Sequence, residues 1–214
     1  MTPEEEKIFR GILFNPGDSE LKAIKMRSHK LSAQFSALNE DDVELRAHIL
    51  SLMIGEFGEG SFIQGPVFFH YGKHTKIGKR CFFNYNLTIQ DDAKVTIGDD
   101  CNFGPNFTIV TPVHPMLPDE RRFMLDKDGI KRHFCYAKPV EIGKDCWFGA
   151  NIVVCPGVKI GDNCVIGAGS VVTRDIPSNS FAAGNPCRMI RDITEADTML
   201  NKPDILADNR PLGE

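Results

Sequence analysis

The sequence of 214 residues lacks several features that mark other classes of protein. No run approaches the about 18 uninterrupted apolar residues of a membrane-spanning helix, and the first six residues are acidic where a secretory signal is basic and then apolar. The seven cysteines are odd in number and include no Cys-x-x-Cys pair, which argues against a disulfide framework and a zinc ribbon. We therefore expect a cytoplasmic protein with reduced thiols.

Charge and composition are also unremarkable for a folded chain. The net charge of −4 gives no general attraction for nucleic acid or for an anionic membrane, so neither is expected as a partner. With 42% apolar and 25% charged residues, disorder, collagen and coiled coil are excluded. The features that need an explanation are the 19 glycines and 15 phenylalanines beside a single tryptophan.

The first 60 residues predict amphipathic helices. Thr2-Pro3-Glu4-Glu5 has the form of a capping box with proline at the first helical position. A second helix places one apolar stripe at Leu21, Ile24, Leu31, Phe35 and Leu38. A third is expected to open at Asn39 and Asp42, to carry Leu45, Ile49, Leu52 and Met53, and to end near Gly55. This N-terminal helical segment, residues 1–60, needs a surface to pack on.

After Gly60 a period of six residues replaces the helical period. Apolar residues recur at this spacing at Ile142, Phe148, Val154, Ile160, Ile166 and Val172, and earlier at Ile77, Phe83, Ile89 and Val95 and then at Ile97, Phe103 and Ile109. Six residues fit one side of a coil of short parallel strands, with the apolar side chain inward and glycine at tight corners. We therefore predict a mainly β fold, a parallel β-helix of hexapeptide repeats over residues 61–192.

Two further features refine this prediction. Cys81, Cys101, Cys146 and Cys164 share one position of the repeat, two residues before the apolar residue, where a buried thiol serves as a small hydrophobe. The interval from Ile109 to Ile142 is not a multiple of six, so a long excursion loop, residues 111–139, must leave the prism, and such loops are often functional. Residues 193–214 form a C-terminal tail whose apolar periodicity is too weak to assign.

Histidines are the natural candidates for acid–base chemistry near neutral pH. His29 and His48 fall on predicted helices, where a surface or packing role is expected; His70 and His74 lie in the first coil, and His133 is expected to be solvated. His114 differs, because it stands at the start of the excursion loop, before a proline that restricts its backbone. Spacing alone does not decide whether it is a catalyst.

Several motifs follow one another along the chain: Phe83-Asn84-Tyr85-Asn86, Val95-Thr96-Ile97-Gly98-Asp99, Phe103-Gly104-Pro105-Asn106, His114-Pro115, Trp147-Phe148-Gly149-Ala150 and Ala182-Ala183-Gly184-Asn185-Pro186. Over about residues 8–193 they resemble the maltose and galactoside O-acetyltransferase family of hexapeptide-repeat acyltransferases. Hexapeptides are shared by many acyltransferases, whereas the Asn-Tyr-Asn, His-Pro and Ala-Gly-Asn-Pro segments in this order are specific. The resemblance implies a left-handed coil and a homotrimer with acetyl-CoA sites between neighbouring subunits.

The resemblance also implies roles for individual residues. Transfer of acetyl from a thioester to a hydroxyl needs a base near neutral pH, and His114 takes that role in the matched motif. Asn84 matches a polar residue beside the reacting groups, which either binds the acceptor or stabilises the oxyanion. Asp92 matches a carboxylate that hydrogen-bonds acceptor hydroxyls, although a turn-capping role is the alternative. We expect direct attack by the hydroxyl, without a covalent acetyl-enzyme.

Coenzyme A presents a pantetheine arm and several phosphates. The resemblance places the arm against small and flat residues, Trp147, Ala150 and Ala168, and the phosphates against Thr173, Arg174, Arg188 and Arg191. Acetyl-CoA is therefore the expected co-substrate, and no metal is expected.

The departures from the family pattern fall on the acceptor side. His70 stands where the family commonly has Asp or Ser contacting the acceptor, Leu13-Phe14-Asn15-Pro16 lacks the usual acidic residue, and Lys25 stands where arginine is usual. The loop from His114 to Pro139 is also longer than typical. The acceptor is expected to be a sugar or a related small hydroxyl compound, and the sequence does not identify it.

Three alternatives stay open at this point. The same base and groove would serve acetylation of an amine or of a xenobiotic. A metal-dependent β-helix enzyme would need three histidines from neighbouring subunits, and the spacings of His70, His74, His114 and His133 do not match that pattern. A non-catalytic trimeric scaffold is opposed by the presence of His114, Asn84 and the arginines on the coenzyme side.

Overall fold

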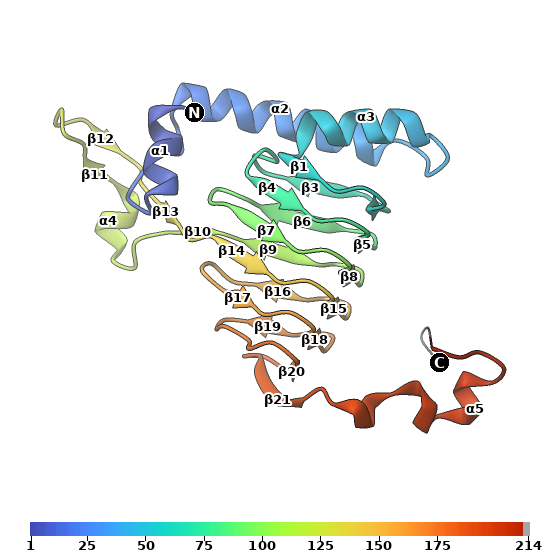
Figure 1. Cartoon of the computed structure of the whole chain (residues 1–214). Helices are drawn as coiled ribbons and strands as arrows, with labels where there is room; N and C mark the ends of the chain where they lie inside the picture. The colour runs from blue at the N-terminus through green and yellow to red at the C-terminus, as the bar shows by residue number, and fades with distance from the viewer. Residues whose placement is uncertain (212–214) are drawn as a thin grey trace.

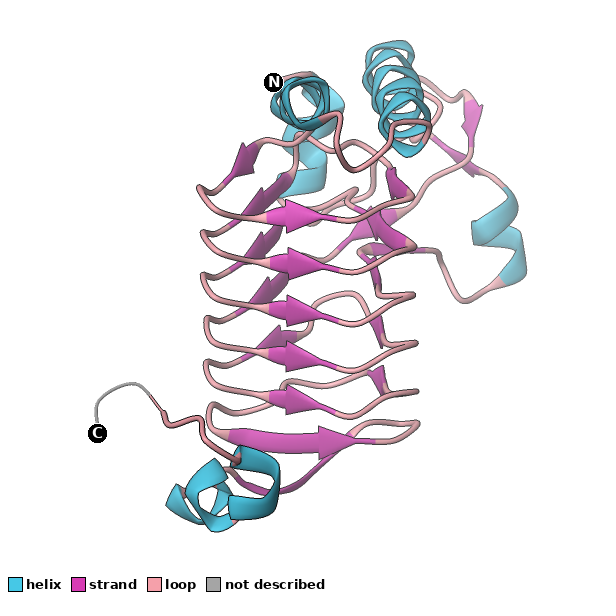
Figure 2. Cartoon of the chain, turned by 90° about the vertical axis from the view of Figure 1, so that its right-hand side faces the viewer, coloured by secondary structure: helices cyan, strands magenta, loops and turns pink. Residues whose placement is uncertain are grey.

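Three sheets of short parallel strands form the walls of a prism in the computed structural model, which describes residues 1–211 (Figures 1 and 2). The first wall contains β1 (Glu56–Phe57), β4 (Thr75–Ile77), β7 (Val95–Ile97), β14 (Val140–Ile142) and β17 (Lys159–Ile160). The second wall contains β2 (Phe62–Ile63), β5 (Phe82–Phe83), β8 (Asn102–Phe103), β15 (Trp147–Phe148), β18 (Val165–Ile166), β20 (Ser180–Ala183) and the antiparallel β21 (Arg188–Asp192). The third contains β3 (Val67–Phe69), β6 (Leu87–Gln90), β9 (Thr108–Val110), β16 (Val153–Val154) and β19 (Val171–Val172).

The predicted hexapeptide coil is confirmed. All the apolar residues of the six-residue period are buried, and residues one coil apart pair in register, as in Phe83 with Phe103 and Phe103 with Phe148. These three rings stack inside the prism, with centroids 4.3 and 4.8 Å apart. The handedness of the coil stays a prediction that rests on the family resemblance.

The column of four cysteines is also buried, as predicted. Each thiol donates to a backbone carbonyl of the following coil, for example Cys81 Sγ to Gly98 O at 3.1 Å and Cys101 Sγ to Gly143 O at 3.2 Å. All seven cysteines are free thiols. The thiols therefore fill small inward positions and also hydrogen-bond successive coils to one another.

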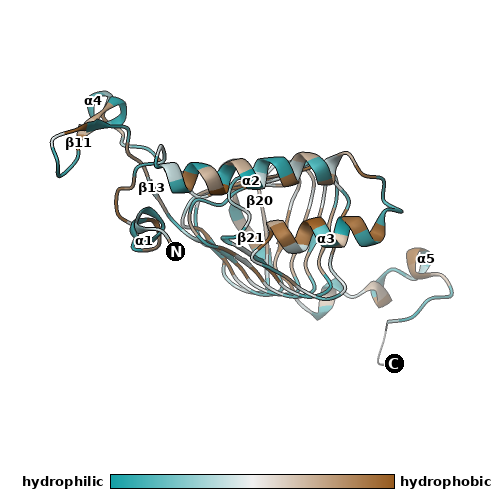
Figure 3. Ribbon diagram, turned by 90° about the horizontal axis from the view of Figure 1, so that it is seen from above, coloured by the Kyte–Doolittle hydropathy of each residue, from teal (hydrophilic) through white to brown (hydrophobic). Residues whose placement is uncertain are grey.

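Helices cover one end of the prism. In α1 (Pro3–Phe9) the predicted capping box of Thr2 and Glu5 is present. The longer α2 (Ser19–Ser36) and α3 (Val43–Met53) lie side by side across the first coil (Figure 3). Because β1 begins at Glu56, the prism starts before the boundary expected at residue 60.

Helix α2 satisfies the exposed backbone edge of β3 with three serines spaced by four residues. Ser28 Oγ donates to Phe69 O at 2.8 Å, Ser32 Oγ accepts from Phe69 N at 3.1 Å, and Ser36 Oγ accepts from Val67 N at 3.0 Å. Residues four apart share one face of a helix, so the spacing matches the strand below. The free edge of the third wall is thereby closed.

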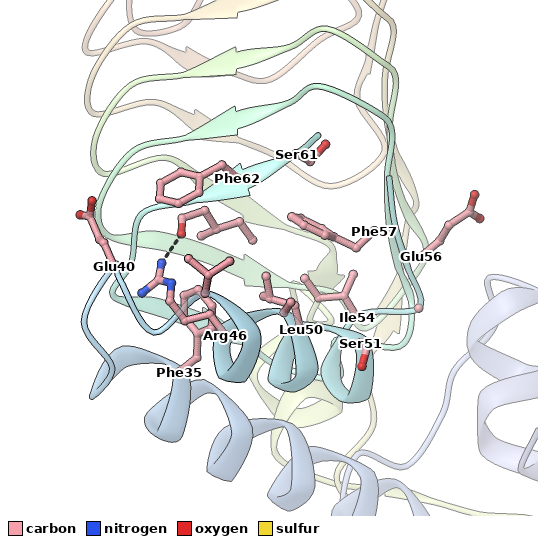
Figure 4. A pocket seen from close by; sticks show the side chains of 14 residues that line it. Phe35, Glu40, Arg46, Leu50, Ser51, Ile54, Glu56, Phe57, Ser61 and Phe62 are labelled. Atoms are coloured by element: carbon pink, nitrogen blue, oxygen red, sulfur yellow. Dashed lines mark hydrogen bonds between the residues drawn. The ribbon is translucent and has the colours of Figure 1, made fainter. Parts of the chain in front are cut away.

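Helix α3 closes the edge of the second wall through Arg46, which is buried and donates to Ile63 O at 2.6 Å and to Gln64 O at 2.9 Å. Its guanidinium lies over the Phe35 ring, beside a cavity of about 430 Å³ between α3 and the first coil (Figure 4). None of the predicted site residues lines this cavity. The cavity therefore lies within the helical cap and apart from the predicted site.

The excursion loop has secondary structure of its own. It contains β10 (Pro112–Val113), α4 (Pro118–Arg122), β11 (Met124–Leu125), β12 (Lys131–Arg132) and β13 (Tyr136–Ala137). The loop projects from one side of the prism, where β10 pairs with β13 (Figure 1). At its tip the Asp126 carboxylate accepts from the backbone of Asp128 and Ile130, both at 2.9 Å, and so holds a tight turn.

The tail leaves the prism after β21. It forms the short helical turns η1 (Glu195–Asp197), η2 (Met199–Asn201) and α5 (Pro203–Leu206), while the last three residues, 212–214, lie outside the described chain. Among residues 1–211 no helix has the length and apolar character needed to cross a bilayer.

Candidate active site

The residues predicted for catalysis and acceptor binding occupy two different edges of the prism. We call the edge between the third and first walls the loop corner, which comprises residues 70–75, 90–94, 111 and 138–139. We call the edge between the second and third walls the asparagine corner, which comprises residues 84–86, 104–106, 149–151 and 167–169. His70, Asp92 and the base of the loop with His114 belong to the loop corner, whereas Asn84, Ala150 and Ala168 belong to the asparagine corner.

Two acidic residues at the loop corner have different tasks. The Asp91 carboxylate accepts hydrogen bonds from Tyr71 N at 2.8 Å, Gly72 N at 3.2 Å and Thr75 Oγ1 at 2.9 Å, and so organises the turn of the preceding coil. Asp92 is only 3% exposed, and its Oδ2 has no hydrogen-bond partner among the described residues. Asp91 thus caps the turn of the preceding coil, whereas Asp92 Oδ2 makes no such contact.

The environment of Asp92 favours its protonated form. Burial, and then the neighbouring charge of Asp91, raise the pKa of Asp92 to about 7, against the opposing influence of Lys25. A carboxyl group with this pKa exists in both protonation states near neutral pH. It can therefore either donate to or accept from a ligand hydroxyl.

His74 holds the backbone on which Asp92 is placed. Its Nδ1 lies 2.9 Å from both Asp91 O and Asp92 O, and its Nε2 lies 2.9 Å from Glu5 Oε1. Glu5 is 1% exposed and also accepts from Lys73 Nζ at 2.6 Å. Helix α1 is in this way tied directly to the turn that carries Asp92.

These contacts set the charge of Glu5. Burial raises the pKa of this carboxyl, but the hydrogen bonds from His74 and Lys73 outweigh burial and lower the pKa to about 2. Glu5 is therefore ionised throughout the physiological range. It is a buried carboxylate with two basic partners.

We expect Glu5→Gln to lower the free energy of unfolding by about 3 kcal/mol at neutral pH. The pKa of Glu5 is lower in the folded chain than in the unfolded chain, so its contribution is complete above the unfolded value near 4.5 and is lost as the pH falls toward 2. Urea unfolding of both proteins between pH 7 and pH 3 should show the difference shrinking. Glu6→Gln, on the exposed face of the same helix, is the control. A difference independent of pH would contradict this account.

His114 is exposed at the start of the excursion loop. Its ring centroid lies 5.4 Å from that of His133, and β10, which precedes it, is fixed by pairing with β13. The following residue, Pro115, lines an open groove of about 760 Å³ between the loop and the N-terminal segment, whose other lining residues are Gly11, Ile12, Leu13, Glu120, Met124 and Tyr136. The residue that follows His114 in the chain therefore lies at a groove large enough for a small organic acceptor.

Asn84 follows β5 directly and is half-buried. Its Oδ1 accepts from Tyr85 N at 2.9 Å, which leaves the side-chain amide N–H groups available as donors. Below it the corner is built by Asn86, Asn106 and Asn151, which share a left-handed backbone conformation with φ of 61°, 60° and 58° and donate side chain to side chain at 2.9 and 2.8 Å. The ladder gives this edge a regular, fixed shape.

The residues predicted to bind coenzyme are spread over the second wall, the asparagine corner and the end of the third wall. Trp147 is 59% exposed on the outer face of the second wall, and Ala150 and Ala168 follow on successive coils at the asparagine corner. Thr173 and Arg174 follow β19 on the third wall, whereas Arg188 and Arg191 lie exposed on β21. Arg191 is engaged by Asp197 through two hydrogen bonds of 2.7 and 2.8 Å.

Within one chain the structure does not bring His114 and Asn84 together. Asn84 follows β5 and His114 follows β10, and these strands lie on opposite sides of the prism (Figure 1). His70 and Asp92, in contrast, share the loop corner with the base of the excursion loop. A single chain thus presents the predicted catalytic and acceptor-binding residues as two separate groups.

Several residues that organise the loop corner were not predicted from the sequence for this role. Glu5 was predicted only as part of the capping box, and neither His74 nor Asp91 was assigned this role, because their partners lie 16 to 69 residues away along the chain. Thr111 extends the same network, since its Oγ1 donates to Gln90 O at 2.8 Å and accepts from Ala93 N at 3.0 Å. In the part of the chain that is described, no group of three or more His, Cys, Asp or Glu side chains is arranged to hold a metal.

Comparison with known proteins relates this geometry to a family. Residues 7–58 match the maltose acetyltransferase hexapeptide capping motif, and residues 94–114 and 139–174 match the hexapeptide repeat of succinyl-transferase. The galactoside O-acetyltransferase of Escherichia coli strain K12 is 40% identical over 195 residues, which cover 91% of this chain and 92% of that protein. The chain belongs to the maltose and galactoside O-acetyltransferase family.

Solved structures of related acetyltransferases share the fold. A galactoside acetyltransferase in complex with coenzyme A has a TM-score of 0.83 and 40% identity, with 92% of this chain and 94% of that chain covered. A hexapeptide-repeat acetyltransferase from Vibrio cholerae in complex with acetyl-coenzyme A has a TM-score of 0.78 and 28% identity, with 91% and 100% covered. The family resemblance found in the motifs is thereby confirmed, together with the parallel β-helix fold.

Proposed function

We propose that the protein transfers the acetyl group of acetyl-CoA to a hydroxyl of a sugar or related small acceptor. The observation that carries this proposal is the similarity over nine-tenths of the chain to a galactoside O-acetyltransferase whose structure contains coenzyme A. The exposed position of His114 on the excursion loop, next in the chain to a residue that lines the groove, supports it. Coenzyme A and acetyl-CoA in the related structures support acetyl-CoA as the co-substrate.

In the proposed reaction His114 acts as general base. It takes the proton of the acceptor hydroxyl as the oxygen attacks the thioester carbonyl, and the carbonyl electrons move onto the oxygen of the tetrahedral intermediate. When the intermediate collapses, the carbon–sulfur bond breaks, and the departing sulfur takes the proton back from His114. The Asn84 amide would donate to the acceptor or to the oxyanion, and Asp92 would hydrogen-bond an acceptor hydroxyl.

We propose that the functional groups meet in a homotrimer. His114 and Asn84 lie on opposite sides of one prism, so a shared reaction centre needs a neighbour. The outer faces of the walls differ in polarity. The second wall exposes the aromatic side chains of Phe62, Phe82 and Trp147, and the third exposes that of Phe68. The first wall instead carries ion pairs, Lys76 with Glu56 at 3.0 Å and Lys159 with Glu141 at 3.1 Å. Packing around a threefold axis would cover the two apolar faces and leave the charged one in water.

We expect Phe82→Glu to abolish trimer formation, because three carboxylates would have to be buried in apolar contacts without partners. Light scattering after gel filtration should show three times the chain mass for the natural protein and a smaller mass for the variant. Thr96→Glu, on the outer face of the first wall, is the control and should leave the mass unchanged. A trimer of unchanged stability in Phe82→Glu would contradict the proposed interface.

The proposed activity is tested by release of coenzyme A from acetyl-CoA in the presence of a panel of monosaccharides, disaccharides, glycosides and amino sugars. Hydroxyl acceptors should accelerate release, and mass spectrometry should show an added acetyl group on oxygen. Acetylation confined to amino groups would favour the amine-acetylating alternative, and no release with any acceptor would contradict the proposal. A cytoplasmic location, the absence of nucleic-acid and membrane partners, and the assigned coenzyme-binding residues stay predictions.

A further inference from the structure

The cavity beside Arg46 in the helical cap has the size and the lining of a small-molecule site. Its volume is about 430 Å³, within the range of about 300–1,000 Å³ that is usual for such sites. Val43, which lines it, is 67% exposed, so the cavity opens to the surface beside α3. Most of the lining is apolar and comes from α2, α3 and the first coil: Phe35, Val43, Leu50, Ile54, Phe57 and Phe62.

A buried cation lines this cavity without an acidic partner. Arg46 is 5% exposed, and no carboxylate among residues 1–211 forms an ion pair with its guanidinium. Its Nη2 donates to Ile63 O and Gln64 O, whereas Nη1 has only a long contact of 3.5 Å with Asn39 O and Nε makes no hydrogen bond within the described chain. Glu40 also lines the cavity, but it is exposed and is not paired with Arg46. Charged side chains are rarely buried without a partner, and this one retains N–H donors for an anion.

The apolar residues continue from Arg46 in a row that suits an extended chain. Leu50 and the C-cap residue Ile54 follow Arg46 at intervals of four residues, so the three side chains lie along one face of α3 (Figure 4). A helix rises about 1.5 Å per residue, so the row spans about 12 Å, roughly the length of a chain of eight to ten carbons. The cavity thus combines one cationic end with a long apolar wall.

We propose that this cavity binds a medium-chain fatty carboxylate, with the carboxylate at Arg46 and the tail along Leu50 and Ile54. The carboxylate accepts a charge-assisted hydrogen bond from the guanidinium, and the tail buries its apolar surface against the cap and the first coil. None of the residues proposed for acetyl transfer lines the cavity. The site is therefore separate from the proposed reaction centre, and its occupancy is measured without any activity.

The charge and the tail are separated by calorimetric titration of the natural protein with octanoate, octanol and butyrate. Octanoate should bind saturably, with one molecule per chain. Octanol lacks the carboxylate and butyrate lacks half of the carbon chain, so each should bind at least about tenfold more weakly. Equal affinities for octanoate and octanol would overturn the proposal, as would the absence of saturable octanoate binding.

The location is tested by a substitution that leaves Arg46 with its carbonyl partners. Ala47 lines the cavity and is exposed on α3, so Ala47→Trp should fill the space with an indole ring and preserve the fold. We expect this variant to bind octanoate at least about tenfold more weakly. Ala33→Trp, at an exposed position of α2 outside the cavity, is the matched control and should stay within about twofold of the natural protein. Undiminished binding by Ala47→Trp, or an equal loss in Ala33→Trp, would contradict the location.

Nuclear magnetic resonance locates the tail in the natural protein, without any variant. Addition of octanoate should shift the methyl resonances of Leu50 and Ile54 and leave that of Ile205, in the C-terminal tail, unchanged. Shifts confined to residues outside the cavity would overturn the proposal. If octanoate shifts the cavity resonances and no acceptor is acetylated, the proposed function fails while the fatty-carboxylate site stands, so the two failures are distinguishable.

Discussion

His114→Ala should lower kcat by about 10² to 10⁴ fold while leaving the affinity for acetyl-CoA nearly unchanged. The expected loss is large because a hydroxyl is a poor nucleophile until its proton is removed in the transition state. His114 is exposed, and its ring centroid lies 5.4 Å from that of His133 on the same loop, so its removal should not disturb the prism. Steady-state rates with the best acceptor of the screen, together with calorimetric titration of coenzyme A, would separate catalysis from binding.

The neighbouring His133 provides a matched control. Its ring lies near His114 and is also exposed, with Nδ1 3.3 Å from Arg122 O. We expect His133→Ala to keep turnover within a few fold of the natural protein. Turnover of His114→Ala within the same range would contradict its assignment as the base, and a loss confined to His133→Ala would transfer that role to His133.

The second large effect is recovery of activity when two inactive chains assemble together. If each site takes His114 from one subunit and Asn84 from its neighbour, His114→Ala and Asn84→Ala chains mixed in equal amounts should regain about a quarter of the natural activity, since one site in four then contains both residues. Each variant alone should be impaired at every site. The chains should be unfolded and refolded together, and the activity of the mixed trimers compared with that of the separate variants.

A double variant carrying both substitutions controls this experiment. Mixed with either single variant, it supplies no missing residue at any site, so no recovery should occur. Recovery in that control would show that activity comes from contaminating natural protein. Mixed trimers of confirmed mass that stay inactive would contradict a site shared between subunits.

The prism could be predicted from sequence because its determinants repeat locally. The position of an apolar residue such as Phe148 or Ile166 within its own hexapeptide is enough to predict that its side chain faces the interior. The four aligned cysteines indicate the same alignment of the coils independently. The N-terminal capping box was predictable for the same reason, since Thr2 and Glu5 are three residues apart. Short-range patterns thus specify the coil and its first helix.

The buried face of α3 shows where such patterns fail. The predicted stripe included Leu45 and Leu52, which are 49% and 43% exposed, whereas Arg46 is buried. The helix packs on a strand edge with free carbonyl groups, and a guanidinium satisfies these groups where leucine would leave them unpaired. Apolar periodicity alone does not reveal a surface that needs donors.

The sequence predicted which residues form the candidate site, but it did not predict where they lie relative to one another. The motifs around His114 and Asn84 indicated acetyl transfer, but only the order of the walls shows that the two residues emerge at different corners. His29 was expected to be a surface or packing residue. Its hydrogen bond with His70 could not be predicted, because the two residues are 41 positions apart in the sequence. Long-range contacts of this kind leave no periodic signal.

The serines of α2 and the buried arginine of α3 have a consequence for the length of the protein. An uncovered coil would present free N–H and C=O groups to any other extended chain, and such edges template fibrillar assembly. With this end sealed, growth of the array from it is arrested whatever the number of coils behind it. Whole coils could therefore be added or deleted in the middle of the prism without exposing the strand edges at this end. The condition is that Ser28, Ser32, Ser36 and Arg46 keep their strand partners.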